Sequence, residues 1–318
     1  MPAIASSAPG KIILFGEHAV VYHRPAIAVP LTGVKAKVTA LADPLAPAGQ
    51  VKIDAPDIHL QTTLEKLPED DPIAIVIRGV LETLGIRSLP AVTLRITSSI
   101  PASAGLGSSA AVAAALARAA STFVGHPLSD EQVSQIAFRA EQRLHGNPSG
   151  IDNSVVAHAR PVYFIRGRAI EFLHLAEPFS LVIADTGIPS ATMDMVGALR
   201  ERWQADPEQH EAWFDRIAEI VDRARSILDN GGCEQLGPLM DANHDLLRTL
   251  GVSCAELDRL VEQALRAGAL GAKLSGAGGG GNMIALVQAG DEERIAARLR
   301  ESGAVWTRST VVSPQGVK

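Results

Sequence analysis

Short runs of alternating apolar and polar residues dominate the first third of the chain. They occupy residues 26–31, 34–41, 51–55, 58–62 and 92–97. Alternation with a period of two is typical of strands that bury one face and leave the other in solvent. Pro, Asp and Gly stand between the runs, where they favour turns. The pattern therefore predicts an antiparallel sheet, because strands with one solvated face are most often antiparallel.

Longer segments carry apolar residues at helical spacing, three or four positions apart. They cover residues 71–84, 110–120, 130–144, 192–203, 208–230, 234–250, 255–267 and 291–302. Ser129-Asp-Glu-Gln132 starts the third of these segments. That sequence is a capping box, in which the serine and glutamine side chains satisfy backbone N–H groups at the start of a helix.

The second half of the chain mixes strands with helices. Its predicted strands are residues 161–166, 169–175, 181–185, 282–288 and 304–312. The first two predict a hairpin that turns at Gly167, and the last two enclose a helix in the split βαβ arrangement. A chain of 318 residues is long enough for two cores. We therefore expect two domains, residues 1–178 and 179–318, divided near Pro178.

A glycine turn precedes the alanine-rich helix of residues 110–120. Gly105 and Gly107 allow a tight turn and close approach of a ligand, and Ser108 and Ser109 can cap the helix with their hydroxyl groups. The N–H groups and the positive end of the helix dipole converge at such a terminus and favour phosphate. This loop is therefore the first candidate for anion binding.

Two familiar phosphate motifs fit this loop incompletely. A P-loop requires a lysine after its second glycine, and no lysine follows Gly107. The dinucleotide pattern Gly-x-Gly-x-x-Ala matches residues 105–110, but it requires a βαβ unit, and here a second helix follows the first. A glycine-capped turn without a ligand is the alternative that the local sequence leaves open.

Acidic residues lie on both sides of a second turn. Glu141 falls in the last turn of the helix at 130–144, where the negative end of the helix dipole disfavours a carboxylate. Arg139, Arg143 or a bound metal ion could compensate its charge. Asp152 follows a stretch rich in glycine and proline, which fixes its backbone. The alternative for Asp152 is that it only caps the short apolar segment after it.

Charged residues bracket the first apolar run. Lys11 opens this run, and Glu17 and His18 close it at a glycine turn. Charged groups at both ends of a short strand can face one pocket. The alternatives are that Lys11 is a solvated charge at the start of a strand and that His18 is a satisfied turn residue.

Two further segments of the second half suggest chemistry. Residues 185–187, Asp-Thr-Gly, match the triplet of aspartic proteases, but those enzymes need two carboxylates that share a proton, and the chain has no second copy. Residues 276–281 contain five glycines. A flexible linker would not normally separate two strand-like runs within one domain. We therefore interpret this cluster as a close approach of the backbone to another segment or to a ligand.

Composition excludes several classes of protein. Hydrophobic residues make up 47% of the chain and charged residues 20%, with a net charge of −6 and no basic run, which argues against nucleic-acid binding. No apolar run approaches the ~20 residues of a membrane-spanning helix, and no leader segment is visible, so we expect neither membrane insertion nor secretion. Cys233 and Cys254 lack metal-ligand spacing and indicate a reducing cytoplasm.

Three blocks, residues 9–18, 101–109 and 273–281, resemble the ordered motifs of the GHMP small-molecule kinases. Residues 8–22 and 145–153 are most similar to the members that phosphorylate mevalonate. The resemblance implies an α+β fold, with an N-terminal domain of mixed sheet and helices and a C-terminal ferredoxin-like domain with extra helices. It implies transfer of the γ-phosphoryl group of ATP to the 5-hydroxyl of mevalonate, and a homodimer would fit the family.

The resemblance also assigns roles to individual residues. Backbone N–H groups would cradle the triphosphate at Ala104, Gly105, Leu106, Gly107, Ser108 and Ser109. Mg²⁺ would be held by Ser109 and Glu141. Asp152 would accept or orient the proton of the acceptor hydroxyl, with the charge of Lys11 beside it. The acceptor would contact Glu17, His18, Thr192, Gly276, Ala277 and Gly278.

Two positions depart from the family pattern. Val112 stands where animal relatives tend to carry a tyrosine, and Met193 stands where many relatives carry a lysine. Neither change removes a catalytic group. Phosphomevalonate, homoserine, a sugar or the 3-hydroxyl of mevalonate are alternative acceptors, and a ligand sensor without activity is an alternative of another class. The joint presence of Lys11, Glu141 and Asp152 disfavours the sensor.

Overall fold

The structure is a computed structural model that describes residues 3–101, 105–146, 148–190 and 192–313. The chain folds into two compact units that interleave along the sequence. Within the described ranges, the first unit is built from residues 3–11, 34–101 and 107–159, and the second from residues 12–33, 105–106 and 160–313. The early residues 12–33 thus belong with the second half of the chain, and the division near Pro178 stays a prediction.

Strands of the first unit form a sheet in the order β4, β3, β5, β2, and β1 also pairs with β2. Their bounds are β1 Ile4–Phe15, β2 Ala26–Ala42, β3 Val51–Ala55, β4 Leu60–Thr63 and β5 Val92–Ser98. β1 and β2 contribute residues to both units. β2 and β5 are antiparallel, with Val38 opposite Ile96, and β3 and β4 are also antiparallel. The alternating pattern therefore located these segments, but the separate strands predicted at 26–31 and 34–41 are one continuous strand, β2.

The expectation of a purely antiparallel sheet is wrong for β3 and β5. These strands are parallel, with Ile53 opposite Leu94. Helix α1, Pro72–Leu84, lies between them in the sequence, and a crossover through a helix returns the chain in the same direction. The run predicted at 58–62 also starts later, because the short 3₁₀ turn η2, Pro56–Ile58, precedes β4.

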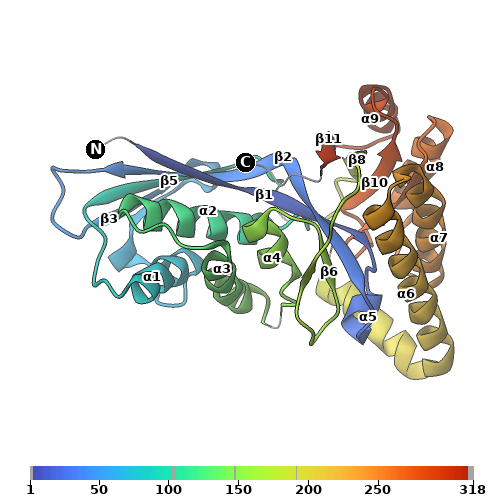
Figure 1. Cartoon of the computed structure of the whole chain (residues 1–318), viewed down its shortest axis with the longest axis horizontal. Helices are drawn as coiled ribbons and strands as arrows, with labels where there is room; N and C mark the ends of the chain where they lie inside the picture. The colour runs from blue at the N-terminus through green and yellow to red at the C-terminus, as the bar shows by residue number, and fades with distance from the viewer. Residues whose placement is uncertain (1–2, 102–104, 147, 191, 314–318) are drawn as a thin grey trace. The chain divides into compact units, whose positions relative to one another are not determined.

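Helices α1 to α4 pack together on one face of this sheet (Figure 1). The last three are α2 Ser108–Phe123, α3 Asp130–His145 and α4 Ile151–His158, and a 3₁₀ turn, η3 Leu64–Lys66, precedes α1. α2 buries most of its alanines, whose small side chains allow close helix packing. α3 begins with the predicted capping box, since Ser129 Oγ accepts from the Gln132 N–H and Gln132 Oε1 accepts from the Ser129 N–H.

The second unit contains a four-stranded antiparallel sheet in the order β11, β8, β10, β9. Its strands are β8 Phe179–Asp185, β9 Gly271–Ser275, β10 Asn282–Val287 and β11 Trp306–Val312. Helices α7 and α8 pack on β9, and α9 packs on β8 and β11 (Figure 1). The helices are α7 Leu236–Thr249, α8 Ala255–Arg266 and α9 Glu292–Glu301. Strands and helix at the end of the chain match the predicted split βαβ pattern.

Two long helices and a short 3₁₀ turn complete the second unit. They are α5 Thr192–Ala205, α6 Pro207–Asn230 and η1 Ala19–Tyr22, with a further 3₁₀ turn, η4 Cys233–Gln235, before α7. The Tyr22 ring stacks on Phe214 at 4.3 Å between centroids, and Arg24 Nε donates to Asp215 Oδ1 at 2.9 Å. These contacts hold η1 against α6, so the residues that precede η1 have a fixed position in this unit.

A hairpin links the two halves of the chain. It is formed by β6 Val162–Phe164 and β7 Glu171–Phe172, which are shorter than predicted, and β6 pairs with the start of β2. Among the described residues, none of the helices combines the length and the hydropathy that crossing a membrane requires.

Candidate active site

An ion pair between Lys11 and Asp152 is the central feature of the first unit. Lys11 Nζ lies 3.1 Å from Asp152 Oδ1. Lys11 is 6% exposed in the middle of β1, so the alternative that it is a solvated charge at the start of a strand is wrong. Asp152 lies in the first turn of α4, whose N-cap is Gly150, so Asp152 is not the cap of this helix. A third of the Asp152 side chain stays exposed, so its carboxylate is accessible to a ligand.

Gly107 brings the glycine turn against this ion pair. Its φ is +72°, a conformation that favours glycine, and a Cβ added to it would lie 2.8 Å from Lys11 Cγ. Gly107 is also the N-cap of α2, which begins at Ser108 without any side-chain cap from the described residues. The prediction that serine hydroxyls cap this helix is therefore wrong. Because the helix begins at Ser108, both serines lie inside its first turn, and Gly107 takes the N-cap position.

The N-terminus of α2 retains the properties that anion binding requires. Its first N–H groups receive no side-chain cap, and the helix dipole is positive at this end. Gly105 is exposed at a φ of +68°, and a Cβ added to it would meet no atom of the described residues within 4 Å, whereas Leu106 is buried. Ser108 and Ser109 are half-buried in the first turn. Ala104 lies outside the described residues, so its predicted contact stays a prediction.

Glu141 is a buried carboxylate of the first unit, 3% exposed, on α3. The two arginines that could compensate it pair elsewhere. Arg139 Nη1 lies 3.0 Å from Glu82 Oε2, and Arg143 Nε lies 3.0 Å from Asp70 Oδ2. The bound cation that the sequence raised as an alternative stays a prediction.

The donor set around Glu141 suits Mg²⁺. This ion is usually held by one or two protein oxygens and completes its shell with phosphates and water. Glu141 on α3 and Ser109 at the start of α2 supply such oxygens, and the two helices pack on each other. No group of three or more His, Cys, Asp or Glu side chains that could hold a metal alone occurs in the part of the chain that the structure describes.

A second ion pair, between Glu17 and Lys273, is fully enclosed in the second unit. Both side chains are 0% exposed, and Lys273 Nζ also donates to the carbonyl of Leu274 at 2.6 Å. Burial lowers the pKa of Lys273, and the negative charge of Glu17 opposes this shift. The sequence pattern did not reveal this pair, although a lysine inside a buried strand is a signal that a partner must exist.

His18 joins the first motif to the glycine cluster within this unit. Its Nε2 lies 2.8 Å from the carbonyl oxygen of Ala277, so Nε2 must carry the proton and donate it. Burial lowers the pKa of His18 to about 4, the Ala277 carbonyl opposes this, and the charge of Arg202 lowers it further. His18 is therefore a neutral donor at neutral pH, and it contacts another residue of the predicted acceptor site.

The glycine cluster approaches two other backbone segments closely. A Cβ at Gly278 would lie 1.8 Å from the carbonyl oxygen of Val252, and one at Gly280 would lie 2.5 Å from that of Ile188. The interpretation as a close backbone approach is therefore confirmed, and a linker is excluded. A Cβ at Gly276 would meet no described atom within 4 Å, so the backbone there remains open to a ligand. Thr192 begins α5, and its side chain lies outside the described part of the chain.

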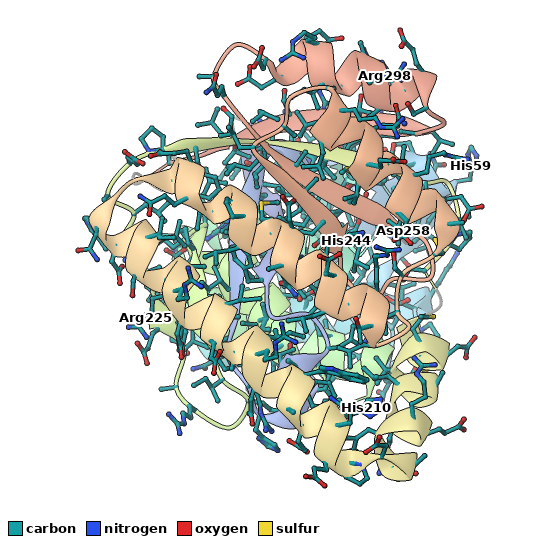
Figure 2. The ribbon with its side chains drawn as sticks, turned by 90° about the vertical axis from the view of Figure 1, so that its right-hand side faces the viewer. His59, His210, Arg225, His244, Asp258 and Arg298 are labelled. Carbon is teal, nitrogen blue, oxygen red and sulfur yellow. The ribbon has the colours of Figure 1, made fainter. Side chains whose placement is uncertain are left out.

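A polar network behind β9 was not predicted. His244 of α7 accepts the Leu274 N–H at Nδ1, 3.3 Å away, so its Nε2 carries the proton. That Nε2 lies 3.2 Å from Oδ1 of Asp258, a residue of α8, and Figure 2 labels both side chains. Asp258 also accepts from Ser253 Oγ at 2.5 Å and from Arg248 Nε at 3.2 Å. The network ties both helices to the strand that carries Lys273.

The buried histidines predict a stability that depends on pH. Burial lowers the pKa of His244 to about 4, with Asp258 and Asp245 opposing and Lys273 and Arg248 adding to the shift. A histidine with a lowered folded-state pKa binds its proton only in the unfolded chain between about pH 4 and 6.5. Stability should therefore fall as the pH drops through this window, by up to about 1.4 kcal/mol per pH unit for each histidine.

Urea denaturation between pH 4 and 7.5 measures this slope. His244→Gln should reduce it, whereas His59→Gln, a change of an exposed histidine (Figure 2), should not. A slope that is the same in the wild type and in both variants would contradict a neutral, buried His244.

Comparison with known proteins agrees with this geometry. Residues 73–159 match the family model of the GHMP kinases N terminal domain, and residues 224–305 match that of the GHMP kinases C terminal domain. The chain belongs to the GHMP kinases. The predicted fold class is confirmed. Among its relatives is the mevalonate kinase of Pyrococcus abyssi, 36% identical over 99% of this chain and 97% of the relative.

The structure is also similar to solved structures of mevalonate kinases. The crystal structure of L. major mevalonate kinase in complex with R-mevalonate has a TM-score of 0.85 and 31% identity, covering 99% of this chain and 97% of the other. The Methanococcus jannaschii mevalonate kinase has a TM-score of 0.84 and 25% identity, covering 98% of each chain. The similarity therefore extends over both compact units.

Proposed function

We propose that this GHMP kinase phosphorylates the 5-hydroxyl of (R)-mevalonate with ATP, giving 5-phosphomevalonate and ADP in isoprenoid biosynthesis. The single observation that carries this proposal is the Lys11–Asp152 pair, 3.1 Å between Nζ and Oδ1, beside the glycine turn at Gly107. The mevalonate kinases that match the chain over nearly its full length support the choice of acceptor.

Asp152 and Lys11 would carry the chemistry at the acceptor. A carboxylate with one oxygen near Lys11 and a third of its surface exposed can accept the hydroxyl proton at Oδ. The hydroxyl oxygen forms the new bond to the γ-phosphorus, and the bond between that phosphorus and the β,γ-bridging oxygen breaks, releasing ADP. Lys11, which is 6% exposed, would neutralise charge that develops on the attacking oxygen.

The donor side would use the N-terminus of α2. Its free N–H groups and the positive end of its dipole would hold the phosphates of ATP. Ser109 and Glu141 would hold Mg²⁺, which when bound neutralises charge on the β- and γ-phosphates. The position of Glu141 on α3, which packs against α2, supports this assignment.

The acceptor side would use residues of the second unit. His18 is neutral because it is buried, and its Nε2–H group donates to the Ala277 carbonyl, so we propose that it acts on the acceptor by holding the backbone at Ala277 in position. Gly276 leaves the backbone open at the start of the glycine cluster. Glu17 is fully enclosed with Lys273, so we propose that it acts on the acceptor through the position of His18, its neighbour in the chain.

The test is an acceptor panel. Purified protein with ATP and Mg²⁺ should release ADP rapidly with mevalonate and slowly with phosphomevalonate, homoserine and galactose. Mass spectrometry and assignment of the phosphorylated oxygen should identify 5-phosphomevalonate. Preference for another acceptor would leave the kinase family in place and refute the choice of mevalonate. From the family likeness we also propose a cytoplasmic homodimer, and its molar mass by light scattering checks the dimer.

A further inference from the structure

The turn between α7 and α8, residues 250–254, contacts the glycine cluster of residues 276–281. The carbonyl oxygen of Val252 accepts a hydrogen bond from the Gly279 N–H at 2.9 Å. A Cβ at Gly278 would lie 1.8 Å from the same oxygen, so no side chain fits between the two segments. The position of this one carbonyl group therefore restricts where the middle of the glycine cluster can lie.

The C-terminal end of α7 holds Val252 in place. Gly251 follows the helix with a φ of +70°, and its N–H donates to the carbonyl of Arg248 at 2.9 Å. The Val252 N–H donates to the carbonyl of Leu247 at 3.1 Å. These two hydrogen bonds and the left-handed glycine form a Schellman motif, which usually includes an apolar contact. Leu247 and Val252 are both fully buried, as this contact requires, so Val252 is held by its N–H group and by its side chain.

The carboxylate of Asp258, in the first turn of α8, connects the turn to α7. Its Oδ1 accepts from Ser253 Oγ at 2.5 Å, and Ser253 is the residue after Val252. The other two partners belong to α7, with His244 Nε2 3.2 Å from Oδ1 and Arg248 Nε 3.2 Å from Oδ2. Figure 2 labels His244 and Asp258 at this place. Asp258 thus holds the residue after Val252 against the helix that precedes it.

The glycine cluster also carries two of the predicted acceptor residues. Ala277 accepts from His18 Nε2 at 2.8 Å, and the Gly278 carbonyl accepts from Ser190 Oγ at 2.9 Å. Both residues directly precede Gly279 in the chain, so a shift of Gly279 would displace them as well. The hydrogen bonds of Asp258 are therefore linked to the predicted acceptor residues through one turn and one backbone contact.

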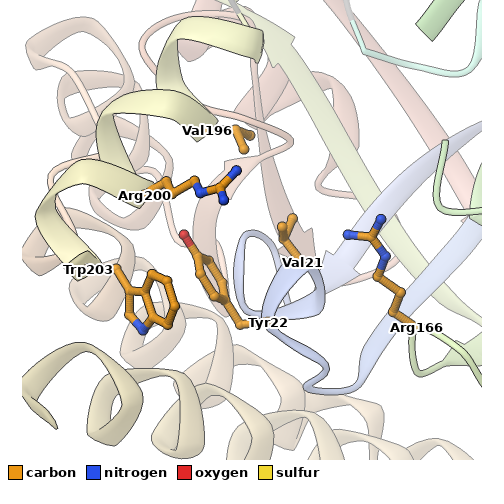
Figure 3. A pocket seen from close by; sticks show the side chains of 6 residues that line it. All are labelled: Val21, Tyr22, Arg166, Val196, Arg200 and Trp203. Atoms are coloured by element: carbon orange, nitrogen blue, oxygen red, sulfur yellow. The ribbon is translucent and has the colours of Figure 1, made fainter. Parts of the chain in front are cut away.

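His18 in turn precedes η1, which forms part of a cleft within the second unit. Val21 of η1 and Val196 of α5 line this cleft of about 270 Å³, which Figure 3 shows. A displacement of Ala277 would remove the hydrogen bond that holds the residue at the start of η1. The position of the glycine cluster thus also affects one wall of the cleft.

We propose that Asp258 is a positioning residue for the acceptor site. By holding Ser253 against α7, it keeps the Val252 carbonyl at the place where that group binds the glycine cluster. The inference rests on the proposed function, which assigns the cluster to the binding of mevalonate. Asp258 acts through the α7–α8 turn and takes no part in proton transfer or in the transfer of the phosphoryl group.

Steady-state kinetics with mevalonate as the acceptor test this role. Asp258→Ala removes all three contacts of the carboxylate and should raise the KM for mevalonate by about tenfold or more, because a small displacement of positioning groups has a large effect. The Kd for ATP should change by less than about twofold, because α2, which we propose to hold the phosphates, belongs to the first unit. A loss of folded protein alone would lower the apparent kcat and leave the KM unchanged.

Two milder variants separate the contacts of the carboxylate. Ser253→Ala removes only the contact to the turn and should raise the KM for mevalonate by about threefold to tenfold, the equivalent of one hydrogen bond. Asp258→Asn keeps an oxygen that accepts from Ser253 and His244, so its KM should stay within about threefold of the wild type. Equal rises in Asp258→Ala and Asp258→Asn would overturn the proposal, because the amide retains the two hydrogen bonds on which it rests.

Asp245→Asn is the control. Asp245 also lies on α7 and pairs with Arg248 at 3.7 Å, but its side chain is 75% exposed and has no contact with Ser253 among the described residues. This variant should leave the KM for mevalonate unchanged. A KM in Asp258→Ala and Ser253→Ala equal to that of the control would overturn the proposal.

Hydrogen exchange separates this proposal from the proposed function, because it needs no acceptor. In Asp258→Ala, the amide groups of the glycine cluster should exchange about tenfold faster or more, because the Gly279 N–H loses an acceptor of fixed position. Amide groups of β11, at the opposite edge of the sheet from β9, should exchange as in the wild type.

The outcomes of this measurement are distinct. Unchanged exchange in the glycine cluster, or an equal rise in β11, would overturn the positioning role even if the protein phosphorylates mevalonate. If exchange rises in the cluster alone but mevalonate is not phosphorylated, the proposed function fails, and the assignment of Asp258 to the position of the cluster stands.

Discussion

Replacing Asp152 by asparagine should lower kcat for mevalonate phosphorylation by about 10²–10⁴-fold, the usual contribution of a positioned general base. Asn keeps the size and a hydrogen-bond acceptor but cannot take the proton of the acceptor hydroxyl. It also leaves Lys11, which is 6% exposed, without its carboxylate partner 3.1 Å away. Because the N-terminus of α2 is not altered, the Kd for ATP should remain within about twofold.

Steady-state kinetics and equilibrium ATP binding together check this expectation. The control is Asp130→Asn, which removes a carboxylate at the start of α3 that pairs with Arg118 on the surface of the same unit. It should leave kcat nearly unchanged. A turnover number for Asp152→Asn equal to that of the control would remove Asp152 from the mechanism, whatever the effect on stability.

Local patterns predicted those features that depend on neighbours in the sequence. The capping box at Ser129 follows from side chains that reach their own helix start, so the sequence contains all the information needed. The glycine cluster could be interpreted because only glycine tolerates a backbone oxygen 1.8 Å from a Cβ position, as at Gly278. Strand positions followed from alternation, but the parallel pairing of β3 with β5 depends on a crossover that alternation does not encode.

Pairs of residues far apart in the chain could not be predicted in the same way. Lys11 and Asp152 were proposed as partners through the family resemblance, because their own surroundings allowed a solvated charge and a helix cap. The pairing of His244 with Asp258 depends on how α7 and α8 cover β9, and neither helix pattern contains that information. The same holds for Glu17 and Lys273, whose partnership is visible only when the tertiary structure encloses both.

Replacing Glu17 by glutamine should destabilise the protein by about 3–5 kcal/mol, as expected when one partner of a buried ion pair is removed. Both side chains are 0% exposed, so water cannot replace the lost carboxylate. The amide oxygen of glutamine can still accept a hydrogen bond from Lys273, as the Leu274 carbonyl does, but it carries no charge to compensate the buried ammonium group. By contrast, Asp43→Asn breaks a pair with Lys52 whose side chains are 24% and 45% exposed, and it should cost much less than Glu17→Gln.

The destabilisation should depend on pH in a direction that identifies its cause. Burial already lowers the pKa of Lys273, and loss of Glu17 removes the charge that opposes this shift. Lysine in the unfolded chain has a pKa of about 10.4. Below that pH, Lys273 is protonated more fully in the unfolded chain than in the folded protein, so the free energy of unfolding rises with pH. Urea denaturation at pH 7 and pH 9.5 should therefore show a smaller deficit for Glu17→Gln at the higher pH.

A double variant, Glu17→Gln with Lys273→Met, distinguishes a buried charge from a packing defect. Removing the ammonium group eliminates the desolvated charge, so the double variant should recover most of the lost stability and should lose the rise with pH. If the double variant is as unstable as Glu17→Gln, shape and hydrogen bonding at this position would be responsible instead. Recovery would show that Glu17 stabilises β9 by neutralising Lys273. The ion pair would then fix the strand that leads directly into the glycine cluster.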